Sequence, residues 1–250
     1  MDLGLKGKIA LVTGATSGVG REIALGLAAE GTRVAVNYRT SADAAARIVD
    51  EIAAAGGEAK AYRGDVADFA AVKAMIDQIA KDFGGLNILI NNAGTAIRQR
   101  FTDSKPEDWR RQIDVCLYGA IHCCHAAAPH LETDKNGRIV GIVGDSSRVG
   151  ESGLALVAAA RAGVIALMKS LAREFGRSGT TANTVSLGLV ETQHDAEWVA
   201  ANREKLIRLY PLRRLGLAGD VAPMVILLAS PHAGWITGQV ISISGGFSMV

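Results

Sequence analysis

The sequence predicts an α/β protein built on one doubly wound, parallel sheet, and three observations support this fold class. Short apolar runs alternate with longer segments of helical periodicity along the 250 residues, which is the pattern of βαβ units. Glycines number 29 against five prolines, a composition that suits many tight turns between strands and helices. A glycine-rich turn, 13–20, follows the first apolar run and begins the first helical segment. The chain, 1–250, is therefore expected to be one domain with helices on both faces of its sheet.

Seven apolar runs are expected to form the strands, because parallel strands that are buried on both faces are apolar almost throughout. They comprise residues 9–12, 34–36, 59–62, 88–90, 139–143, 181–185 and 240–243. Helical patterns lie between them at residues 22–30, 42–55, 69–83, 107–131, 156–175 and 220–228, and several of these end at a glycine. Residues 191–215 follow neither pattern and are predicted to form an irregular, mobile lid over a site.

The charge pattern argues against two classes of partner. The net charge of +2 comes from 27 basic and 25 acidic residues with no run of one sign, so neither a nucleic acid nor an anionic membrane is expected as a partner. No apolar stretch approaches the roughly 18–20 residues of a membrane span, and the first eight residues lack the apolar core of a signal peptide. The expected location is cytoplasmic, and the expected partners are small molecules and other protein chains.

The three cysteines do not suggest a disulfide framework. Cys116, Cys123 and Cys124 are an odd number, and two of them are adjacent, so reduced thiols are predicted. His122 and His125 flank the adjacent pair at helical spacing, which raises the alternative of a metal site. The segment is rich in alanine and has the pattern of a buried helix, whereas structural zinc sites usually draw paired ligands from turns. No metal is therefore expected.

The glycine-rich turn is the strongest functional signal in the chain. Glycines let the backbone turn sharply and approach a pyrophosphate, whose charge the free amides at the helix N-terminus then meet. A turn of this kind between a strand and a helix predicts a Rossmann-type dinucleotide site, with a turn that binds nothing as the alternative. The residues expected to touch the cofactor here are Gly14, Ser17, Gly18, Val19 and Gly20.

The turn belongs to a set of motifs that spans nearly the whole chain. Thr-Gly-x-x-x-Gly-x-Gly at 13–20 is followed by Gly-Asp-Val at 64–66, Asn-Asn-Ala-Gly at 91–94 and Ile-Thr-Gly at 236–238. In these motifs the chain resembles the short-chain dehydrogenase/reductase family, and in pattern it is most similar to bacterial β-ketoacyl-carrier-protein reductases. The resemblance implies that the cofactor's adenine, ribose and nicotinamide ends contact, in that order, Asp65 and Val66, then Asn92, Ala93 and Gly94, then Thr192.

The residues after the second predicted strand favour NADP over NAD. Proteins that prefer NAD place an acidic residue there to bind the ribose 2′-hydroxyl, whereas this chain has Asn37, Tyr38 and Arg39. No carboxylate is present to repel a phosphate, and Arg39 is expected to pair with the 2′-phosphate of NADP. The alternative is that Arg39 is an ordinary surface arginine.

The family resemblance also locates the reaction machinery, and four positions there carry unsuitable residues. The family uses a Tyr and a Lys four residues apart for proton transfer, a Ser 13 residues before the Tyr to orient the substrate oxygen, and an Asn for a water relay. The matching positions hold Val157, Arg161, Gly144 and Cys116. Arg161 keeps a positive charge and donors for the ribose, but a guanidinium does not release a proton at neutral pH. No intact catalytic residue is therefore predicted.

Three hypotheses follow from this substituted site. The first is a catalytically silent protein that binds NADP and works by associating with other chains. It would form a homo-oligomer, which in the family is often a tetramer, or a hetero-oligomer with an active relative. The helical segments 107–131 and 156–175 correspond to those that pair across subunits in the family. The second is a divergent NADP-dependent oxidoreductase with relocated acid chemistry, drawing on Asp145, Ser146, Arg148, Arg98 or Cys116. The third is a hydrolase or lyase in the same cleft, with Asp145 or His194 as the base.

Overall fold

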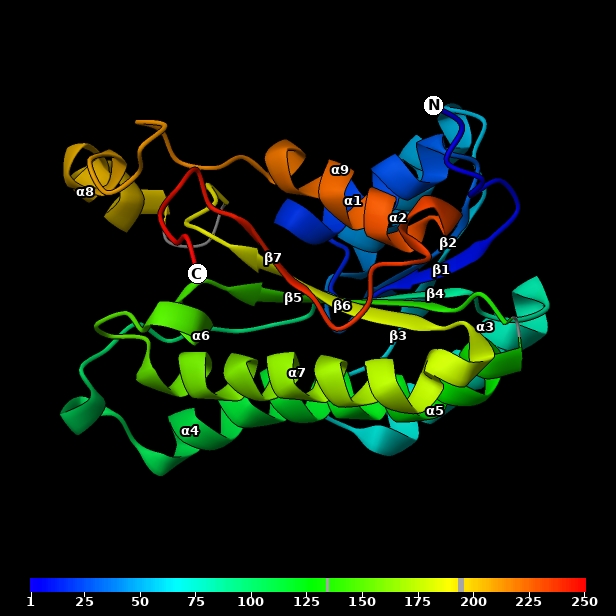
Figure 1. Cartoon of the computed structure of the whole chain (residues 1–250), viewed down its shortest axis with the longest axis horizontal. Coiled ribbons are helices and arrows are strands. Elements are labelled where there is room, and N and C mark those ends of the chain that lie inside the picture. Colours follow the sequence, from blue (N-terminus) through cyan, green and yellow to red (C-terminus); the bar gives the residue numbers. More distant parts are fainter. Residues whose placement is uncertain (134, 193–195) are drawn as a thin grey trace.

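Seven parallel strands form one sheet in the computed structural model, in the order β3-β2-β1-β4-β5-β6-β7 (Figure 1). The structure describes residues 1–133, 135–192 and 196–250. The strands are β1 (Ile9–Val12), β2 (Arg33–Tyr38), β3 (Ala59–Arg63), β4 (Ile88–Asn91), β5 (Arg138–Gly144), β6 (Thr181–Leu187) and β7 (Val240–Ile243). Each matches one predicted apolar run, and five of them extend one to three residues further, so the predicted parallel sheet is confirmed.

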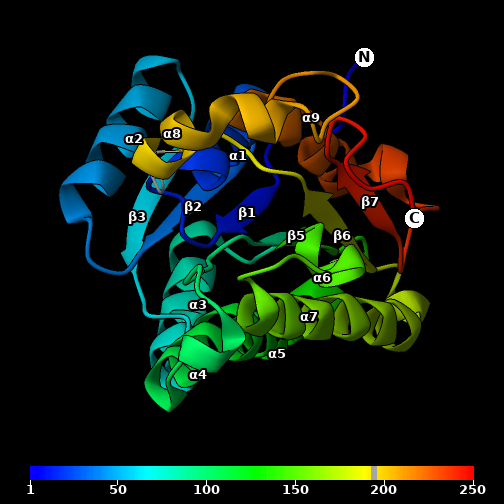
Figure 2. The same cartoon turned by 90° about the vertical axis from the view of Figure 1, so that its left-hand side faces the viewer.

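Helices cover both faces of the sheet, as predicted. They are α1 (Gly18–Ala29), α2 (Ala42–Ala54), α3 (Phe69–Phe83), α4 (Pro106–Ile113), α5 (Gly119–Thr133), α6 (Ser146–Val149), α7 (Ala155–Glu174), α8 (Ala196–Ile207) and α9 (Ala218–Ala229). Helices α1, α2 and α9 lie on one face, and α3, α4, α5 and α7 lie on the other (Figures 1 and 2). The short α6, α8 and the C-terminus lie together at one end of the molecule (Figure 1).

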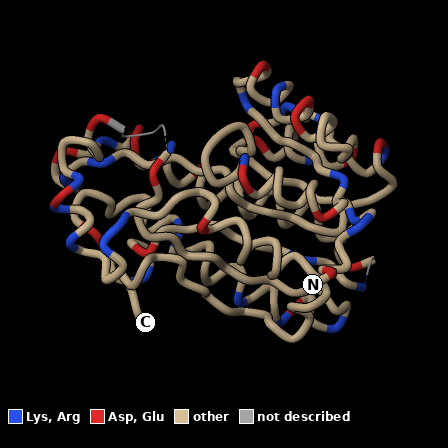
Figure 3. The backbone as a smooth tube through the Cα atoms, turned by 90° about the horizontal axis from the view of Figure 1, so that it is seen from above, with Lys and Arg blue, Asp and Glu red and all other residues tan. Residues whose placement is uncertain are grey.

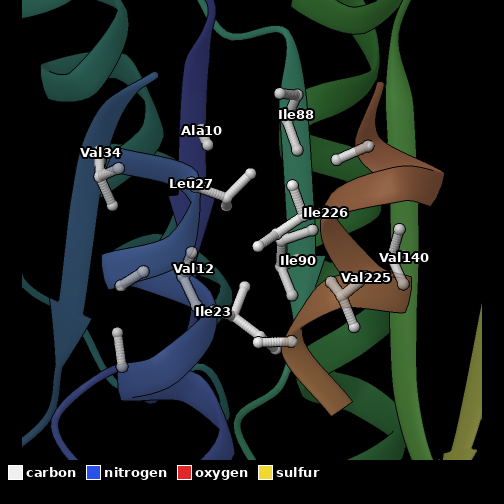
Figure 4. Packing of buried hydrophobic residues seen from close by; sticks show 14 of the residues in the cluster. Ala10, Val12, Ile23, Leu27, Val34, Ile88, Ile90, Val140, Val225 and Ile226 are labelled. Atoms are coloured by element: carbon white, nitrogen blue, oxygen red, sulfur yellow. The ribbon is translucent and has the colours of Figure 1, made fainter. Parts of the chain in front are cut away.

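Helices α1 and α9 pack side by side on the sheet and bury its central strands. Ile23 and Leu27 from α1 meet Val225 and Ile226 from α9 above the aliphatic side chains of the strands (Figure 4). A glycine, Gly26, permits this contact, since a β-carbon there would lie 2.4 Å from Cδ1 of Ile226. Strand β1 is buried at every residue, which explains its unbroken apolar sequence.

The helix predicted at 107–131 is interrupted in the structure. Helix α4 ends at Ile113, the segment η2 (Asp114–Tyr118) is a π-helical turn, and α5 begins at Gly119. Single π turns inside α-helices are rare and cover only a few residues, so the helical pattern of 107–131 did not reveal this one. Cys116 lies inside this turn and is buried.

The predicted irregular lid at 191–215 contains a helix, so that prediction was wrong in part. Helix α8 has few buried apolar residues, of which Val199 is one, and its helical periodicity is correspondingly weak. Two contacts hold the segment against the rest of the chain. Arg203 forms an ion pair with Glu191 at 2.7 Å, and the guanidinium carbon of Arg98 lies 4.6 Å from the ring centre of Trp198.

Helix α7 is more apolar than the sequence analysis allowed. The stretch Ala155–Ser178, which adds the short 3-10 turn η3 (Phe175–Ser178), has 24 residues, and its most apolar 18-residue window has a mean hydropathy of 1.6, enough to cross a membrane by length and composition. The prediction that no such stretch exists was therefore wrong. One helix of this kind is weak evidence for a span, because core helices of soluble proteins pass the same test. Here α7 packs against β5 and β6, and 33% of the most apolar window is buried inside the chain.

Charged side chains of both signs are spread over the molecule. Figure 3 draws Lys and Arg beside Asp and Glu along most of the backbone, without a stripe of one sign. The charges agree with the balanced composition of 27 basic and 25 acidic residues. The exclusion of nucleic-acid partners stays a prediction from that balance.

Candidate functional site

A cleft of about 530 Å³ opens at the carboxyl edge of the sheet. It lies where β1 and β4 meet, which is where the order of the strands reverses and where open α/β sheets bind ligands. All the residues predicted to contact the cofactor line this cleft: Gly14, Ser17, Gly18, Val19, Gly20, Arg39, Asp65, Val66, Asn92, Ala93, Gly94, Arg161 and Thr192. Their binding roles stay predictions, but the fold brings them to one place.

The glycine-rich turn is built for close approach of the backbone. Gly14 and Gly18 have φ angles of +60° and +53°, which favour glycine strongly. A β-carbon on Gly20 would lie 2.4 Å from Nδ2 of Asn92, so no larger residue fits there without a shift of the turn. The side chain of Ser17 does not cap α1, and the amides of the first helical turn face a polar cleft. This arrangement suits a pyrophosphate.

A set of hydrogen bonds, here called the Thr13–Asn92 clasp, joins the ends of β1 and β4. Oγ1 of Thr13 donates to the carbonyl of Ile90 at 3.2 Å and accepts the amides of Asn92 and Ala93 at 2.9 and 3.0 Å. In return, Nδ2 of Asn92 donates to the carbonyls of Thr13 and Gly14 at 2.9 and 3.1 Å. The amide group of Asn92 therefore positions the glycine turn, a role that the sequence did not reveal.

The two residues Asn37 and Arg39 have different roles at the end of β2: Asn37 supports the glycine turn, and Arg39 is available to a ligand. Asn37 is buried: its Oδ1 accepts the amide of Gly14 at 3.1 Å, and its Nδ2 donates to the carbonyl of Gly64 at 3.0 Å. Arg39 is half-exposed at the mouth of the cleft, and its Nη1 lies 3.8 Å from Oδ2 of Asp65. This long contact leaves most guanidinium donors of Arg39 available to an incoming phosphate.

The position where the resemblance expects the proton-donating Tyr is apolar and closed. Val157 is 1% exposed and packs with Cys116 and Ala160 in a small group, here called the Val157 cluster. The thiol of Cys116 donates to the carbonyl of Thr95 at 3.2 Å and accepts the amide of the same residue at 3.4 Å. Two of the four substituted positions thus belong to one packed core that has no group facing the cleft.

The other two substituted positions touch each other across the cleft floor. A β-carbon on Gly144 would lie 3.3 Å from Nη1 of Arg161, and one on Gly94 would lie 2.9 Å from Nη2. The guanidinium therefore occupies space next to two main-chain segments, and a side chain at either glycine would push it aside. The sequence analysis treated Gly144 and Arg161 as separate losses, whereas the structure couples them.

Most of the alternative acids and donors are already engaged. Asp145 is 1% exposed and accepts hydrogen bonds from the hydroxyls of Ser186 and Ser242. Arg98 pairs with Glu151 at 2.9 Å. Ser146 is buried, and its Oγ lies 3.3 Å from the position of a β-carbon on Gly144. Arg148 lies in the same short helix, α6, and His194 lies outside the described residues.

No tyrosine hydroxyl among the described residues lies beside Gly144. Tyr38 is the one tyrosine that lines the described part of the cleft, and it adjoins Arg39 at the opposite end. Tyr62 donates to Asp82, and Tyr118 is half-exposed on η2. Tyr210 is buried, which raises its pKa, and its hydroxyl accepts the amide of Leu189 at 2.8 Å.

The histidines and cysteines of α5 have structural roles. Nδ1 of His122 lies 2.9 Å from the carbonyl of Val66, and the part of the chain that the structure describes contains no group of three potential metal ligands. Cys116, Cys123 and Cys124 are buried and form no disulfide in the structure; their reduced state stays a prediction. Burial raises the pKa of Cys124 to about 12, which keeps its thiol protonated.

Comparison with known proteins finds relatives along the whole chain. A family model described as enoyl-(acyl carrier protein) reductase matches residues 14–248. The 3-oxoacyl-(acyl-carrier-protein) reductase of Staphylococcus aureus is 40% identical over 242 residues, covering 97% of this chain and 98% of that protein. The 3-oxoacyl-(acyl-carrier-protein) reductase of Synechocystis is 38% identical over 246 residues, covering 98% of each.

A further relative and two solved structures extend this result. A subunit of a hydroxy(phenyl)methylsuccinyl-CoA dehydrogenase from Thauera aromatica is 34% identical over 247 residues, covering 99% of each chain. The crystal structure of a putative gluconate dehydrogenase from Agrobacterium tumefaciens superposes with a TM-score of 0.95 at 27% identity, over all of both chains. A dehydrogenase/reductase from Sinorhizobium meliloti gives 0.92 at 32% identity, over 99% of this chain and 98% of that one.

The Thr13–Asn92 clasp predicts a specific loss of stability. Thr13→Val removes the acceptor of the Ala93 amide and is expected to cost about 1–3 kcal/mol of unfolding free energy, a fall in Tm of roughly 3–10 °C. Thr13→Ser keeps the hydroxyl and is expected to stay within about 1 kcal/mol of the parent. Thermal unfolding of the three proteins measures this, and equal Tm values for Thr13→Val and the parent would contradict the role of the clasp.

The position of Arg39 predicts a change in cofactor preference. Arg39→Gln removes a charge-assisted contact to a 2′-phosphate and is expected to weaken NADPH binding about tenfold, with NADH changed by less than about threefold. Calorimetric titration with both nucleotides measures the two affinities. Arg47→Gln, an exposed position on α2 outside the cleft lining, is the matched control. An equal effect of Arg39→Gln on NADPH and NADH would contradict 2′-phosphate recognition.

Proposed function

The chain belongs to the short-chain dehydrogenase/reductase family, and we propose that within it this protein binds NADP(H) without catalysing ordinary ketone reduction. The observation that carries the proposal is the Val157 cluster: the position of the proton donor is an apolar side chain, 1% exposed, packed against Cys116 and Ala160. The same cleft keeps the glycine turn and Arg39, which suit a phosphorylated dinucleotide.

The residues present fit the cofactor at its adenine end. The first turn of α1 offers uncapped amides to a pyrophosphate, and Arg39 offers a cation to the 2′-phosphate. Asp65 and Val66 are proposed to bracket the adenine, and Asn92, Ala93, Gly94 and Thr192 to line the ribose and nicotinamide end. When bound, the nicotinamide group supplies or accepts a hydride at the end of the cleft that Gly144 lines.

At that end, Val157 and Gly144 stand at the two positions where the family resemblance expects the groups that make hydride transfer to a ketone fast. A positioned general acid contributes about 10²–10⁴ in rate, and one donor to the developing oxyanion contributes about 10²–10³. The two effects act together and do not simply multiply. With Val157 and Gly144 in these places, ketone reduction is expected to be slower by several powers of ten than in a complete site.

We propose that the protein works as a subunit of an oligomer in the cytoplasm. Only one third of the most apolar 18-residue window of helix α7 is buried within the chain, so part of this apolar surface is left for another subunit. Tyr118 and Trp109 add exposed aromatic area on the same face of the sheet. A homo-oligomer is the simplest arrangement. The Thauera aromatica relative is named as a subunit, which supports a hetero-oligomer with an active relative as the second arrangement.

A divergent oxidoreductase is the second candidate function, and one observation favours it. Oγ of Ser146 lies 3.3 Å from where a β-carbon of Gly144 would be, close to the position where the resemblance expects a hydroxyl. Because position 157 offers no proton donor, the compatible substrates are those that accept hydride without taking up a proton at the same moment, such as an iminium ion. The hydrolase or lyase hypothesis has less support, because Asp145 is buried and engaged by Ser186 and Ser242.

Restoring the four family residues is expected to create activity. The variant Cys116→Asn, Gly144→Ser, Val157→Tyr, Arg161→Lys should oxidise NADPH with an acetoacetyl thioester, because it regains a proton donor and an oxygen-orienting hydroxyl. The parent should show no turnover above background. The measurement is NADPH absorbance with time, with NADPH affinity and Tm determined in parallel.

The matched control for this experiment is the same variant with Phe at position 157 in place of Tyr. It has nearly the same volume and lacks only the hydroxyl, so its rate should be at least about 10²-fold lower. Turnover by the parent at ordinary enzyme rates, roughly 1–10³ s⁻¹, would overturn the proposed function. A folded restored variant that binds NADPH and is no faster than the control would also count against it.

A further inference from the structure

A buried carboxylate, that of Asp145, joins three strand ends behind one wall of the cleft. Asp145 directly follows β5, and its Oδ1 accepts the hydroxyl of Ser186, in β6. The hydroxyl of Ser242, in β7, lies 2.8 Å from both carboxylate oxygens. These three residues are here called the Asp145 network. Because burying a charge is costly unless it is hydrogen-bonded, the two serines stabilise the carboxylate at this position.

The Asp145 network is continuous with the main chain that lines the cleft. Gly144 and Leu187 line the cleft, and they are the chain neighbours of Asp145 and Ser186. The amide of Asp145 donates to the carbonyl of Leu187 at 2.8 Å. Both the side chain and the main chain of Asp145 therefore connect β5 to β6 at this point. A shift of its carboxylate would move the wall at the end of the cleft that Gly144 lines.

Gly188 extends this wall and is packed closely from behind. Its amide donates to the carbonyl of Ile243, in β7, at 3.1 Å, and a β-carbon on Gly188 would lie 3.0 Å from Cα of Ser244. Oγ of Ser244 lies 3.2 Å from Oγ of Ser242, so the Asp145 network reaches this support too. The wall consequently depends on β7 as well as on β5 and β6.

The other end of the cleft is built from different elements. The glycine turn and Arg39 follow β1 and β2, where the Thr13–Asn92 clasp and Asn37 support the turn. In the sheet, β4 and β5 separate these strands from β6 and β7. Changes at sites that share no partners act nearly independently. A change in the Asp145 network is therefore expected to affect one half of a bound dinucleotide more than the other.

We propose that Asp145 is a positioning residue for the nicotinamide half of NADP(H). Its carboxylate, through Ser186 and Ser242, holds the Gly144 end of the cleft in the shape that receives this half, while the adenine half is supported elsewhere. The inference rests on the proposed cofactor-binding function and deepens it, because it assigns a separate support to each half of the cofactor.

Calorimetric titration with NADPH and adenosine 2′,5′-bisphosphate tests this role. The bisphosphate has the adenosine and the two phosphates at its 2′ and 5′ positions and lacks the nicotinamide half, so the parent should bind NADPH at least about tenfold more tightly. Asp145→Ala removes the acceptor of both serines and is expected to weaken NADPH at least about tenfold and the bisphosphate less than about threefold. Equal losses for the two nucleotides, or unchanged NADPH binding by the folded variant, would overturn the inference.

Two variants at Ser242 separate the hydrogen bond from a general loss of structure. Ser242→Ala removes one donor to the carboxylate and should weaken NADPH at least about threefold, whereas Ser242→Thr keeps a hydroxyl and should bind like the parent. Ser230→Ala is the matched control, since Ser230 is buried outside the described cleft lining and its Oγ donates to the carbonyl of Leu227 at 2.7 Å. It should change neither affinity by more than about threefold. A loss in Ser230→Ala as large as in Ser242→Ala would contradict a specific role.

Amide hydrogen exchange of the free proteins tests the wall without any nucleotide. The amides at positions 145 and 188 should exchange at least about tenfold faster in Ser242→Ala than in Ser242→Thr, while those of Asn92 and Ala93 should differ by less than about threefold. Equal exchange of all four amides in the two variants would overturn the support of the wall by the Asp145 network.

Failure of the cofactor-binding function is distinguishable from failure of this inference. If the parent binds neither nucleotide, the proposed function fails and the inference falls with it. If the parent and Asp145→Ala bind NADPH with the same preference over the bisphosphate, the function stands and the inference is wrong. Should Asp145→Ala fail to fold, the comparison of Ser242→Ala with Ser242→Thr gives the same decision.

Discussion

The hydrogen bonds between the ends of β1 and β4 determine the geometry of everything around the cleft. These two strands are neighbours in the sheet, but the chain leaves them toward opposite sides, so an opening forms between their ends. Side-chain hydrogen bonds of Thr13 and Asn92 to the main chain join the two strand ends at the base of this opening. They hold the glycine turn in place relative to β4. Asn37 braces the same turn from β2. The amides of α1 consequently face the cleft from a rigid support.

The residues proposed to bind the cofactor's phosphates and the positions of the family's reaction machinery lie at opposite ends of this cleft. The first set matches the family pattern, and the second departs from it. At the α1 end the glycines, the polar clasp and Arg39 form a site that suits a phosphorylated nucleotide. At the Gly144 end, an apolar cluster and the guanidinium of Arg161 stand where the family resemblance expects proton-transfer groups. Both ends of the cleft belong to the same family fold, yet one end keeps the expected residues and the other does not. A fold alone therefore does not fix a function. Only the residues at the site can decide the chemistry.

The sequence predicted the strands and most helices because their apolar patterns are local. The π turn around Cys116, helix α8 and the apolar stretch of α7 were not anticipated, since the first is a rare interruption of a few residues and α8 has little periodicity. Every predicted cofactor contact reached the cleft; most of their motifs lie at strand ends, whereas Arg161 comes from the middle of α7. Contacts between distant residues could not be predicted: Thr13 and Asn92 are 79 positions apart, and nothing local links Gly144 to Arg161.

The fit of Arg161 between two glycines has a consequence for the history of this chain. Residues in direct contact do not contribute independently, so the effect of changing one depends on the identity of the other. A side chain regained at Gly144 alone would meet the guanidinium of Arg161, and a tyrosine regained at Val157 alone would meet Cys116 and Ala160. A return to the family residues therefore depends on changing these neighbours together, since the identities of Arg161 and Cys116 limit what positions 144 and 157 can accommodate.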